Sequence, residues 1–213
     1  MQFHWLNKQN NDKLIIFFAG WSFDYKPFEF LNCNDFDVLM VYDYNEVSDL
    51  PDFENYSKKH LIAWSMGVFV AYQMRSKLPK FDKKIAINGT IFPVDDEFGI
   101  PQKPFLLTLR GAKIGLEGKF YENVFNEDYE KYLLNPIERS IDNRVSELKI
   151  LYDKIKSAEK SYEEFYDKAL VSSNDKIFPP KNQLNFWKDK AEIIDSNHFP
   201  YYNFNSWNEI LCK

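Results

Sequence analysis

A serine flanked by small residues lies in the first third of the chain, within the sequence Ala63-Trp64-Ser65-Met66-Gly67. An apolar run of strand length precedes it, and an apolar run of helix length follows. A strand, a small-x-Ser-x-Gly turn and a helix are the context expected of a nucleophile elbow, whose strained turn leaves no room for bulky neighbours. Ala63 replaces the more usual first glycine, a difference of one methyl group. Ser65 is therefore the candidate nucleophile, although so short a pattern also arises by chance.

One of the three histidines lies where a base for this serine would be expected. His198 follows the last apolar run of strand length, whereas His60 begins the strand that leads to Ser65 and His4 lies near the amino terminus. Sites in parallel sheets form at the carboxyl ends of the strands, so His60 would lie at the wrong edge. His198 is the candidate base, because a neutral imidazole can accept the serine proton near neutral pH.

The candidate acid is Asp175, in a loop that directly follows an apolar run over residues 167–172. Aspartates are common in turns, so a purely structural turn residue is one alternative. Asp195 also lies near the histidine loop and is the alternative acid. The order Ser65, Asp175, His198 is the nucleophile–acid–base order of one family of α/β folds, and this order strengthens the prediction.

Two backbone N–H groups could stabilise the oxyanion that forms when a serine attacks a carbonyl. In this architecture one donor comes from a loop after an early strand and the other from the residue after the nucleophile. The sequence Phe18-Ala19-Gly20-Trp21 ends an early apolar run, so we expect the donors to be Trp21 and Met66. The alternative is an ordinary turn at the end of a strand, with the Trp21 side chain in the core.

The elements that must position these residues follow from the alternation of apolar runs and helix-like stretches. Continuous apolar runs are typical of strands buried on both faces of a parallel sheet. We expect strands at residues 13–18, 37–42, 60–64, 84–89, 167–172 and 191–195, and helices near 25–31, 66–78, 180–189 and 205–211. The pattern predicts a single α/β domain over residues 1–213, with a mostly parallel, doubly wound sheet flanked by helices.

Residues 101–160 interrupt the alternation, because they contain no convincing buried strand. Apolar residues recur there at steps of mostly three or four, which places them on one helix face. These residues are Ile137, Ile141, Val145, Leu148 and Tyr152. We predict a helical lid or cap over the carboxyl ends of the strands. The alternative is that these helices simply cover one face of the sheet.

The composition excludes several functional classes. The net charge of −5 argues against broad electrostatic binding to nucleic acid. The two cysteines, Cys33 and Cys212, lie far apart and indicate neither a disulfide scaffold nor a four-ligand zinc site. The amino terminus does not resemble a signal peptide, and the longest apolar run near it is too short to span a membrane. We expect a cytoplasmic monomer without a metal.

Together these motifs resemble the α/β-hydrolases and, more narrowly, the BioG-type pimeloyl-[acyl-carrier protein] methyl ester esterases of biotin biosynthesis. The matching segments are Phe18–Trp21, Ala63–Gly67, Asn88-Gly89-Thr90 with Pro93, Gly99-Ile100-Pro101, Ser173–Asp175 and His198-Phe199-Pro200. The elbow and the oxyanion loop are also similar to those of the longer BioH-type esterases. The resemblance implies hydrolysis of a methyl ester on a pimeloyl chain carried by acyl carrier protein, with a Ser-His-Asp triad and no cofactor.

An acidic carrier protein as partner would favour a basic surface near the entrance to the site. Three of the four arginines, Arg110, Arg139 and Arg144, lie in the expected lid, and we predict that they contact the carrier. The alternative is a solvated helix face on which acidic residues are interspersed. Those acidic residues are Glu117, Glu138 and Glu147.

Aromatic residues are unusually frequent, with 20 Phe, 13 Tyr and 5 Trp. Most must pack in the core, because large rings bury much apolar area per residue. Some lie in the loops at the expected strand ends, and we predict that Trp21, Phe92 and Phe178 line an apolar channel for the acyl chain. The alternative places Phe92 and Phe178 in the core.

Two other functions remain open at this point. Fold and triad do not fix the acyl group, so another ester or thioester hydrolase is possible. A hydrolase-like binding module without activity is disfavoured, because the serine, the aspartate, the histidine and the oxyanion loop are all present.

Overall fold

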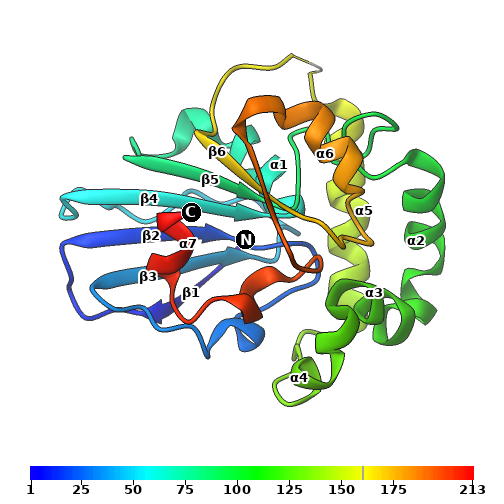
Figure 1. Ribbon diagram of the computed structural model, residues 1–213, viewed down its shortest axis with the longest axis horizontal. Helices are drawn as coiled ribbons and strands as arrows, with labels where there is room; N and C mark the ends of the chain where they lie inside the picture. The colour runs from blue at the N-terminus through cyan, green and yellow to red at the C-terminus, as the bar shows by residue number, and fades with distance from the viewer. Residues whose placement is uncertain (160) are drawn as a thin grey trace.

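A twisted seven-stranded sheet forms the centre of the molecule, in the strand order β1-β3-β2-β4-β5-β6-β7 (Figure 1). The structure is a computed structural model that describes residues 1–159 and 161–213. The strands are β1 (Gln2–Asn7), β2 (Lys13–Phe18), β3 (Phe36–Tyr42), β4 (Lys58–Trp64), β5 (Lys83–Ile87), β6 (Lys168–Ser172) and β7 (Ala191–Ile194). β1 pairs with β3 in the antiparallel sense, and every other pair is parallel. The predicted mostly parallel α/β sheet is confirmed.

The strands at the centre of the sheet consist of apolar residues that are almost entirely buried. Residues 14–18 of β2, 61–64 of β4 and 85–87 of β5 have no exposed surface or nearly none. Such strands carry no polar face because helices or loops cover both sides of a parallel sheet. These are the strands that lead to the predicted site residues, so the core fixes where their carboxyl ends lie.

Helices outside the sheet pack against these strands. The helices are α1 (Met66–Gln73), α6 (Pro180–Trp187) and α7 (Trp207–Cys212). Short 3-10 turns lie at Lys26–Phe28, Arg75–Lys77, Asn126–Asp128, Lys188–Lys190 and Pro200–Asn203. α1 is buried against β2 and β4, and α6 packs against β6. The helices expected near 66–78, 180–189 and 205–211 are present, whereas residues 25–31 form only a 3-10 turn.

A second group of helices lies at the carboxyl ends of the strands, at the right of Figure 1. It consists of α2 (Gln102–Gly115), a π-helical segment Leu116–Phe120, α3 (Tyr121–Phe125), α4 (Tyr129–Leu133) and α5 (Ile141–Ser157). The predicted helical character of residues 101–160 is therefore present in the part of this region that the structure describes. The Ser140 hydroxyl caps α5 by accepting the Asn143 N–H.

The buried face of α5 differs from the predicted apolar stripe. Arg144, Glu147, Leu148 and Leu151 are buried, whereas Ile141, Val145 and Tyr152 are half-buried and Ile137 precedes the helix. Two charged residues thus lie on the inner face, where a pattern based on hydrophobicity places none. Each has an ion-pair partner, Glu117 for Arg144 and Arg139 for Glu147, which explains why it is buried.

Candidate active site

Ser65 lies in the sharp turn between β4 and α1 and has an unusual backbone conformation. Its φ of 56° and ψ of −125° are rarely adopted by a residue with a side chain. Neighbouring backbone crowds this turn, because a Cβ on Gly67 would lie 2.3 Å from the Phe18 carbonyl oxygen. A Cβ on Gly89 would lie 2.4 Å from the Ser65 carbonyl oxygen. Only glycine fits at these two positions, and the packed turn holds the serine at the end of its strand.

The side chains of Ser65, His198 and Asp175 form a continuous hydrogen-bonded chain. His198 Nε2 lies 3.0 Å from Ser65 Oγ, and His198 Nδ1 lies 2.8 Å from Asp175 Oδ2. All three residues are buried. If Nδ1 of a neutral imidazole donates its proton to the carboxylate, Nε2 is free to accept a proton from the serine. The structure thus brings together the three residues that the sequence analysis singled out.

Asp175 is held by more contacts than the one to the histidine. Its Oδ1 accepts the backbone N–H groups of Ile177 and Phe178, both at 2.8 Å, and its Oδ2 accepts Gln183 Nε2 at 3.2 Å. Hydrogen bonds of this kind fix the orientation of the carboxylate. Asp195, the alternative acid, is exposed and instead accepts Ser173 Oγ at 3.1 Å. The geometry favours Asp175.

Two side chains that the sequence analysis did not assign to the site hold the histidine loop. The indole Nε1 of Trp64 donates to the His198 carbonyl oxygen at 2.8 Å, and Asn88 Nδ2 donates to the same oxygen at 3.0 Å. Asn88 Oδ1 also accepts the Ser172 N–H at 2.8 Å. Asn88 therefore joins the ends of β5 and β6 to the histidine loop. Its place directly after a strand, next to Gly89, is the signal that could have identified it.

The two predicted oxyanion donors are available for a ligand. Within residues 1–159 and 161–213, neither the Trp21 N–H nor the Met66 N–H donates to a protein acceptor. The loop that carries Trp21 passes close to the nucleophile, since a Cβ on Gly20 would lie 3.1 Å from Ser65 Cβ. Met66 is the first residue of α1 and adjoins the serine. Both assignments remain predictions.

A largely apolar cavity of about 370 Å³ opens next to the serine. Its floor contains Trp21, Trp64, Ser65, Met66 and His198, and helices α2, α3 and α5 supply most of the opposite wall. The wall residues include Pro104, Phe105, Thr108, Gly111, Ala112, Leu116, Phe120, Val124 and Leu148. A cavity of this size and character is typical of sites for small apolar ligands.

Comparisons with known proteins assign the chain to a family. The family model described as pimeloyl-ACP methyl esterase BioG matches residues 1–210. The chain belongs to the BioG family. A crystal structure of BioG from Haemophilus influenzae superposes with a TM-score of 0.91 at 31% identity, covering 98% of this chain and 99% of that one. An uncharacterized protein from the same species is 32% identical over 93% of this chain and 94% of its own length.

Two further comparisons extend this result. A malonyl-[acyl-carrier protein] O-methyltransferase from Bacteroides fragilis is 34% identical over 87% of this chain, and the match spans only 39% of that protein. A lipase-esterase related protein from Clostridium acetobutylicum shares the fold, with a TM-score of 0.60 at 17% identity over 93% of this chain and 92% of that one. BioG membership and the α/β-hydrolase fold make this chain a hydrolase.

Two of the predicted acyl-chain contacts of this BioG-family chain lie away from the cavity. Phe178 is buried and stacks on the His198 ring, with 6.2 Å between ring centroids. Phe92 packs against Phe98 and Phe186. Neither ring is part of the cavity wall, so the prediction that they line the channel is wrong; Trp21 does line it.

Two of the three arginines predicted to contact a carrier protein are buried. The Arg139 side chain is 8% exposed and pairs with Glu147 at 2.9 Å and Asp43 at 3.2 Å. The Arg144 side chain is 3% exposed and pairs with Glu117. The prediction is wrong for these two residues, because their guanidinium groups already have buried partners. Arg110 is exposed on α2 and remains a candidate.

The alternative of a solvated helix face also fails for part of α5. Glu147 is fully buried, and its carboxylate accepts the Ser22 N–H, the Tyr44 N–H and Arg139 Nη1. Burial raises the pKa of the Glu147 carboxyl above its ordinary value, while Arg139 and two backbone N–H groups oppose this shift. A carboxyl group with this many donors has a structural reason to lie inside the protein.

The other two histidines lie outside the site. His4 stacks on Tyr25 and the His60 ring contacts Phe36, so neither histidine lies near Ser65. No group of His, Cys, Asp and Glu side chains suited to a metal ion occurs among the described residues. In the same part of the chain, no helix is long and apolar enough to cross a membrane.

Proposed function

We propose that this chain is a serine carboxylesterase that hydrolyses the methyl ester of pimeloyl-acyl carrier protein in biotin synthesis. The observation that carries the proposal is the buried chain of hydrogen bonds from Ser65 through His198 to Asp175. It opens onto an apolar cavity in a member of the BioG family. The products are methanol and pimeloyl-acyl carrier protein with a free carboxylate.

The proposed mechanism uses side chains and backbone groups alone. His198 Nε2 takes the Ser65 proton as Ser65 Oγ attacks the ester carbonyl, and Asp175 stabilises the imidazolium that forms. The N–H groups of Trp21 and Met66 hold the oxyanion; loss of one such donor typically costs about 3–4 kcal/mol of barrier. His198 then protonates the departing methoxide, which leaves as methanol. It next takes a proton from a water molecule that attacks the acyl-enzyme carbonyl, and returns that proton to Ser65 Oγ as the acid is released.

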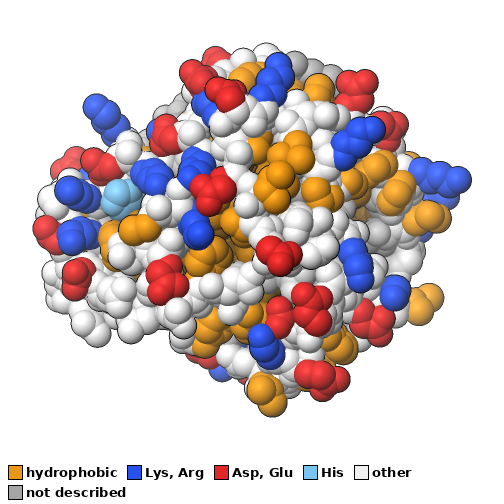
Figure 2. Space-filling view, viewed as in Figure 1, with side chains coloured by type: hydrophobic (Ala, Val, Ile, Leu, Met, Phe, Trp, Pro, Cys, Tyr) orange, Lys and Arg blue, Asp and Glu red, His pale blue; other side chains and the backbone are white. Residues whose placement is uncertain are grey.

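The cavity and the helices around it support an acyl chain attached to a carrier. Apolar side chains such as Phe105, Leu116 and Leu148 form a wall that suits methylene groups. The carrier would stay outside, and we propose that the exposed Arg110 contacts it, while Lys119 and Lys176 border the cavity and are also exposed. Figure 2 shows acidic and basic side chains interspersed on the face of the molecule that it draws.

The relative from Bacteroides fragilis supports the choice of substrate. The name of that protein describes transfer of a methyl group to malonyl-acyl carrier protein. A methyl ester formed on a carrier-bound acid is the group that an esterase would later remove. We propose accordingly that the chain acts in the cytoplasm, as a monomer, with residues 101–160 as a lid over the acyl chain.

The test compares carrier-bound pimeloyl methyl ester with short nitrophenyl esters and an acyl thioester. We expect the wild-type protein to prefer the carrier-bound ester, and Ser65→Ala to lose activity by a factor on the order of 10⁴ or more. Rescue of a biotin-requiring strain that lacks its own esterase should likewise depend on Ser65. Preference for a thioester would identify another hydrolase of the same fold, and absence of fluorophosphonate labelling at Ser65 would favour a binding module.

A further inference from the structure

The loop after β2 that carries the predicted oxyanion donor has a strained backbone one residue further on. Ser22, which follows Trp21, has a φ of 75°, in the left-handed region that side chains disfavour. Such a conformation persists only where the surrounding structure holds it. The contacts that hold Ser22 therefore also decide where the preceding residue lies.

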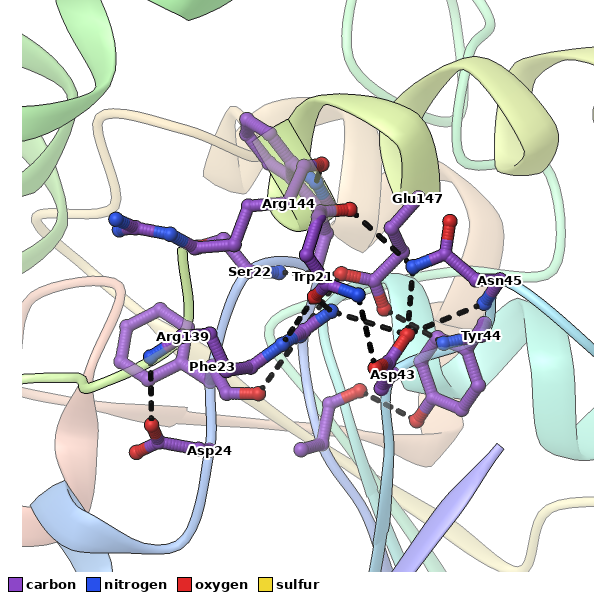
Figure 3. Close-up of polar contacts among 12 residues, drawn as sticks. Trp21, Ser22, Phe23, Asp24, Asp43, Tyr44, Asn45, Arg139, Arg144 and Glu147 are labelled. Carbon is purple, nitrogen blue, oxygen red and sulfur yellow. Dashed lines mark hydrogen bonds and ion pairs between the residues drawn. The ribbon is translucent and has the colours of Figure 1, made fainter. Parts of the chain in front are cut away.

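The contact to the Ser22 backbone comes from the buried carboxylate of Glu147 on α5 (Figure 3). Glu147 Oε2 accepts the Ser22 N–H at 3.1 Å, and Oε1 accepts the Tyr44 N–H at 2.8 Å. One side chain thus joins α5 to the loop after β2 and to the loop after β3. These bonds link residues more than a hundred positions apart in the chain.

Arg139 completes the arrangement from the residues just before α5. Its Nη1 lies 2.9 Å from Glu147 Oε2 and donates to the Phe23 carbonyl oxygen at 3.0 Å. Its Nη2 lies 3.2 Å from Asp43 Oδ1. Breaking a buried ion pair of this kind is costly, yet replacing both partners by apolar residues is often harmless to stability. The Glu147 carboxylate also satisfies two buried backbone N–H groups, so a test of a further role for the pair has to separate that role from stability.

The Trp21 side chain is held by the same helix. Its indole Nε1 donates to the Arg144 carbonyl oxygen at 2.7 Å. The Ser22 hydroxyl in turn lies 2.9 Å from the Tyr121 hydroxyl. Trp21, Ser22 and Phe23 thus each have a hydrogen bond to the segment between α3 and α5. The backbone contact that fixes the strained residue is the one to Glu147.

We propose that Glu147 is a positioning residue that holds the oxyanion loop in its active conformation. The carboxylate holds the Ser22 amide and thereby the peptide bond between Trp21 and Ser22. The Trp21 N–H therefore stays directed toward the oxygen of the ester carbonyl when Ser65 attacks. Arg139 opposes the effect of burial on the carboxylate, orients it, and anchors Phe23. This inference rests on the proposed function, because it assigns Glu147 a part in the serine esterase reaction.

The test removes the charged pair as a unit, in the variant Glu147→Leu/Arg139→Met. The matched control is Glu117→Leu/Arg144→Met, which removes the other Arg–Glu pair of this segment without removing a side-chain bond to residues 21–23. Two quantities are measured: kcat on a nitrophenyl ester, and affinity for phenylboronic acid, whose adduct with Ser65 places an oxygen at the oxyanion position. Thermal unfolding of each variant shows whether the protein is folded.

We expect kcat of the first variant to fall about 10- to 100-fold, with KM changed less than threefold, because one oxyanion donor is misplaced. Boronate affinity should fall in parallel, and the control should keep both within about twofold. Equal changes in the two double variants would overturn the proposal. If the first variant does not fold, Glu147→Asp decides: it keeps the charge but withdraws the carboxylate from Ser22, and an unchanged kcat would refute the role.

The two proposals fail in different ways. A wild-type protein that does not hydrolyse carrier-bound pimeloyl methyl ester would refute the proposed function. Boronate binding needs no turnover, so unchanged affinity in Glu147→Leu/Arg139→Met would refute the role of Glu147 whatever the substrate is.

Discussion

The substitution Asp175→Asn tests whether the contacts around the acid set the tautomer of His198, that is, which ring nitrogen carries the proton. Two backbone N–H groups donate to Asp175 Oδ1 at 2.8 Å each, and His198 Nδ1 lies 2.8 Å from Oδ2. An asparagine would keep its oxygen toward the two backbone N–H groups, since the opposite orientation places its NH₂ against two donors. Its NH₂ would then face His198 Nδ1.

This orientation forces the wrong tautomer. Nδ1 of His198 would have to accept the amide hydrogen, so the imidazole proton would move to Nε2. Nε2, 3.0 Å from Ser65 Oγ, could then no longer accept the serine proton. Loss of the base function in this way lowers kcat by about 10⁴, which corresponds to about 5.4 kcal/mol of barrier.

The assay is hydrolysis of a nitrophenyl ester by Asp175→Asn, with Asp195→Asn as the matched control. Asp195 is exposed and has no bond to the imidazole, so its variant should keep kcat within about twofold. Fluorophosphonate labelling of Ser65 should slow together with kcat. A folded Asp175→Asn protein that keeps more than a tenth of wild-type kcat would refute the tautomer argument, and a comparable loss in Asp195→Asn would reassign the acid.

Three further predictions follow from single contacts. Gly67→Ala should destabilise the protein by about 3 kcal/mol, a fall in Tm on the order of 6–12 °C, because its Cβ would lie 2.3 Å from a carbonyl oxygen of β2. The control is Gly115→Ala, whose Cβ meets nothing within 4 Å. Equal Tm values of the two variants would contradict the prediction. Arg110→Glu should raise KM for the carrier-bound ester about tenfold and spare a nitrophenyl ester, whereas equal loss on both would exclude a docking role. Burial raises the pKa of the Cys33 thiol to about 11, so iodoacetamide at pH 8 should label the exposed Cys212 well before Cys33. The rate at Cys33 should increase about tenfold per pH unit up to that pKa, and a rate already independent of pH near 8 would contradict the shift.

Ser65 and Asp175 could be predicted because each follows a buried strand, and His198 because it follows the short apolar run of the edge strand β7. Strands β2 to β6 are continuous apolar runs, since both faces of the sheet are covered, and their ends are therefore visible in the sequence. β1 gave no such signal. It is an edge strand with half-exposed residues, and its pairing with β3 contains an irregularity between Trp5 and Asn7.

The contacts of Glu147 could not be predicted, because its backbone partners lie more than a hundred positions away in the chain. No spacing rule in the sequence indicates the contacts of the Glu147 carboxylate or of the Gln183 amide. Arg144 and Glu147 were assigned to exposed surface because charge usually indicates solvent. Only the folded arrangement shows that α5 turns both residues inward, Glu147 toward the loops after β2 and β3 and Arg144 toward Glu117 and Tyr121.

The same contacts limit how residues 101–160 could act as a lid. α5 cannot move away from the sheet without taking the Glu147 carboxylate from Ser22, so a lid that moved as one body would undo the oxyanion loop at each opening. α2 and the π-helical segment pair with α5 through Lys113–Asp142 and Glu117–Arg144, but among the described residues none of their side chains bonds to the loops after β2 and β3. They also contain Gly111, Gly115 and Gly118, and glycine weakens a helix by about 1 kcal/mol per residue. We therefore expect amide hydrogen exchange in residues 102–120 to be faster than in the central turns of α5. Equal protection of the two segments would mean that the helices open together, and the oxyanion loop would then have to be rebuilt in every catalytic cycle.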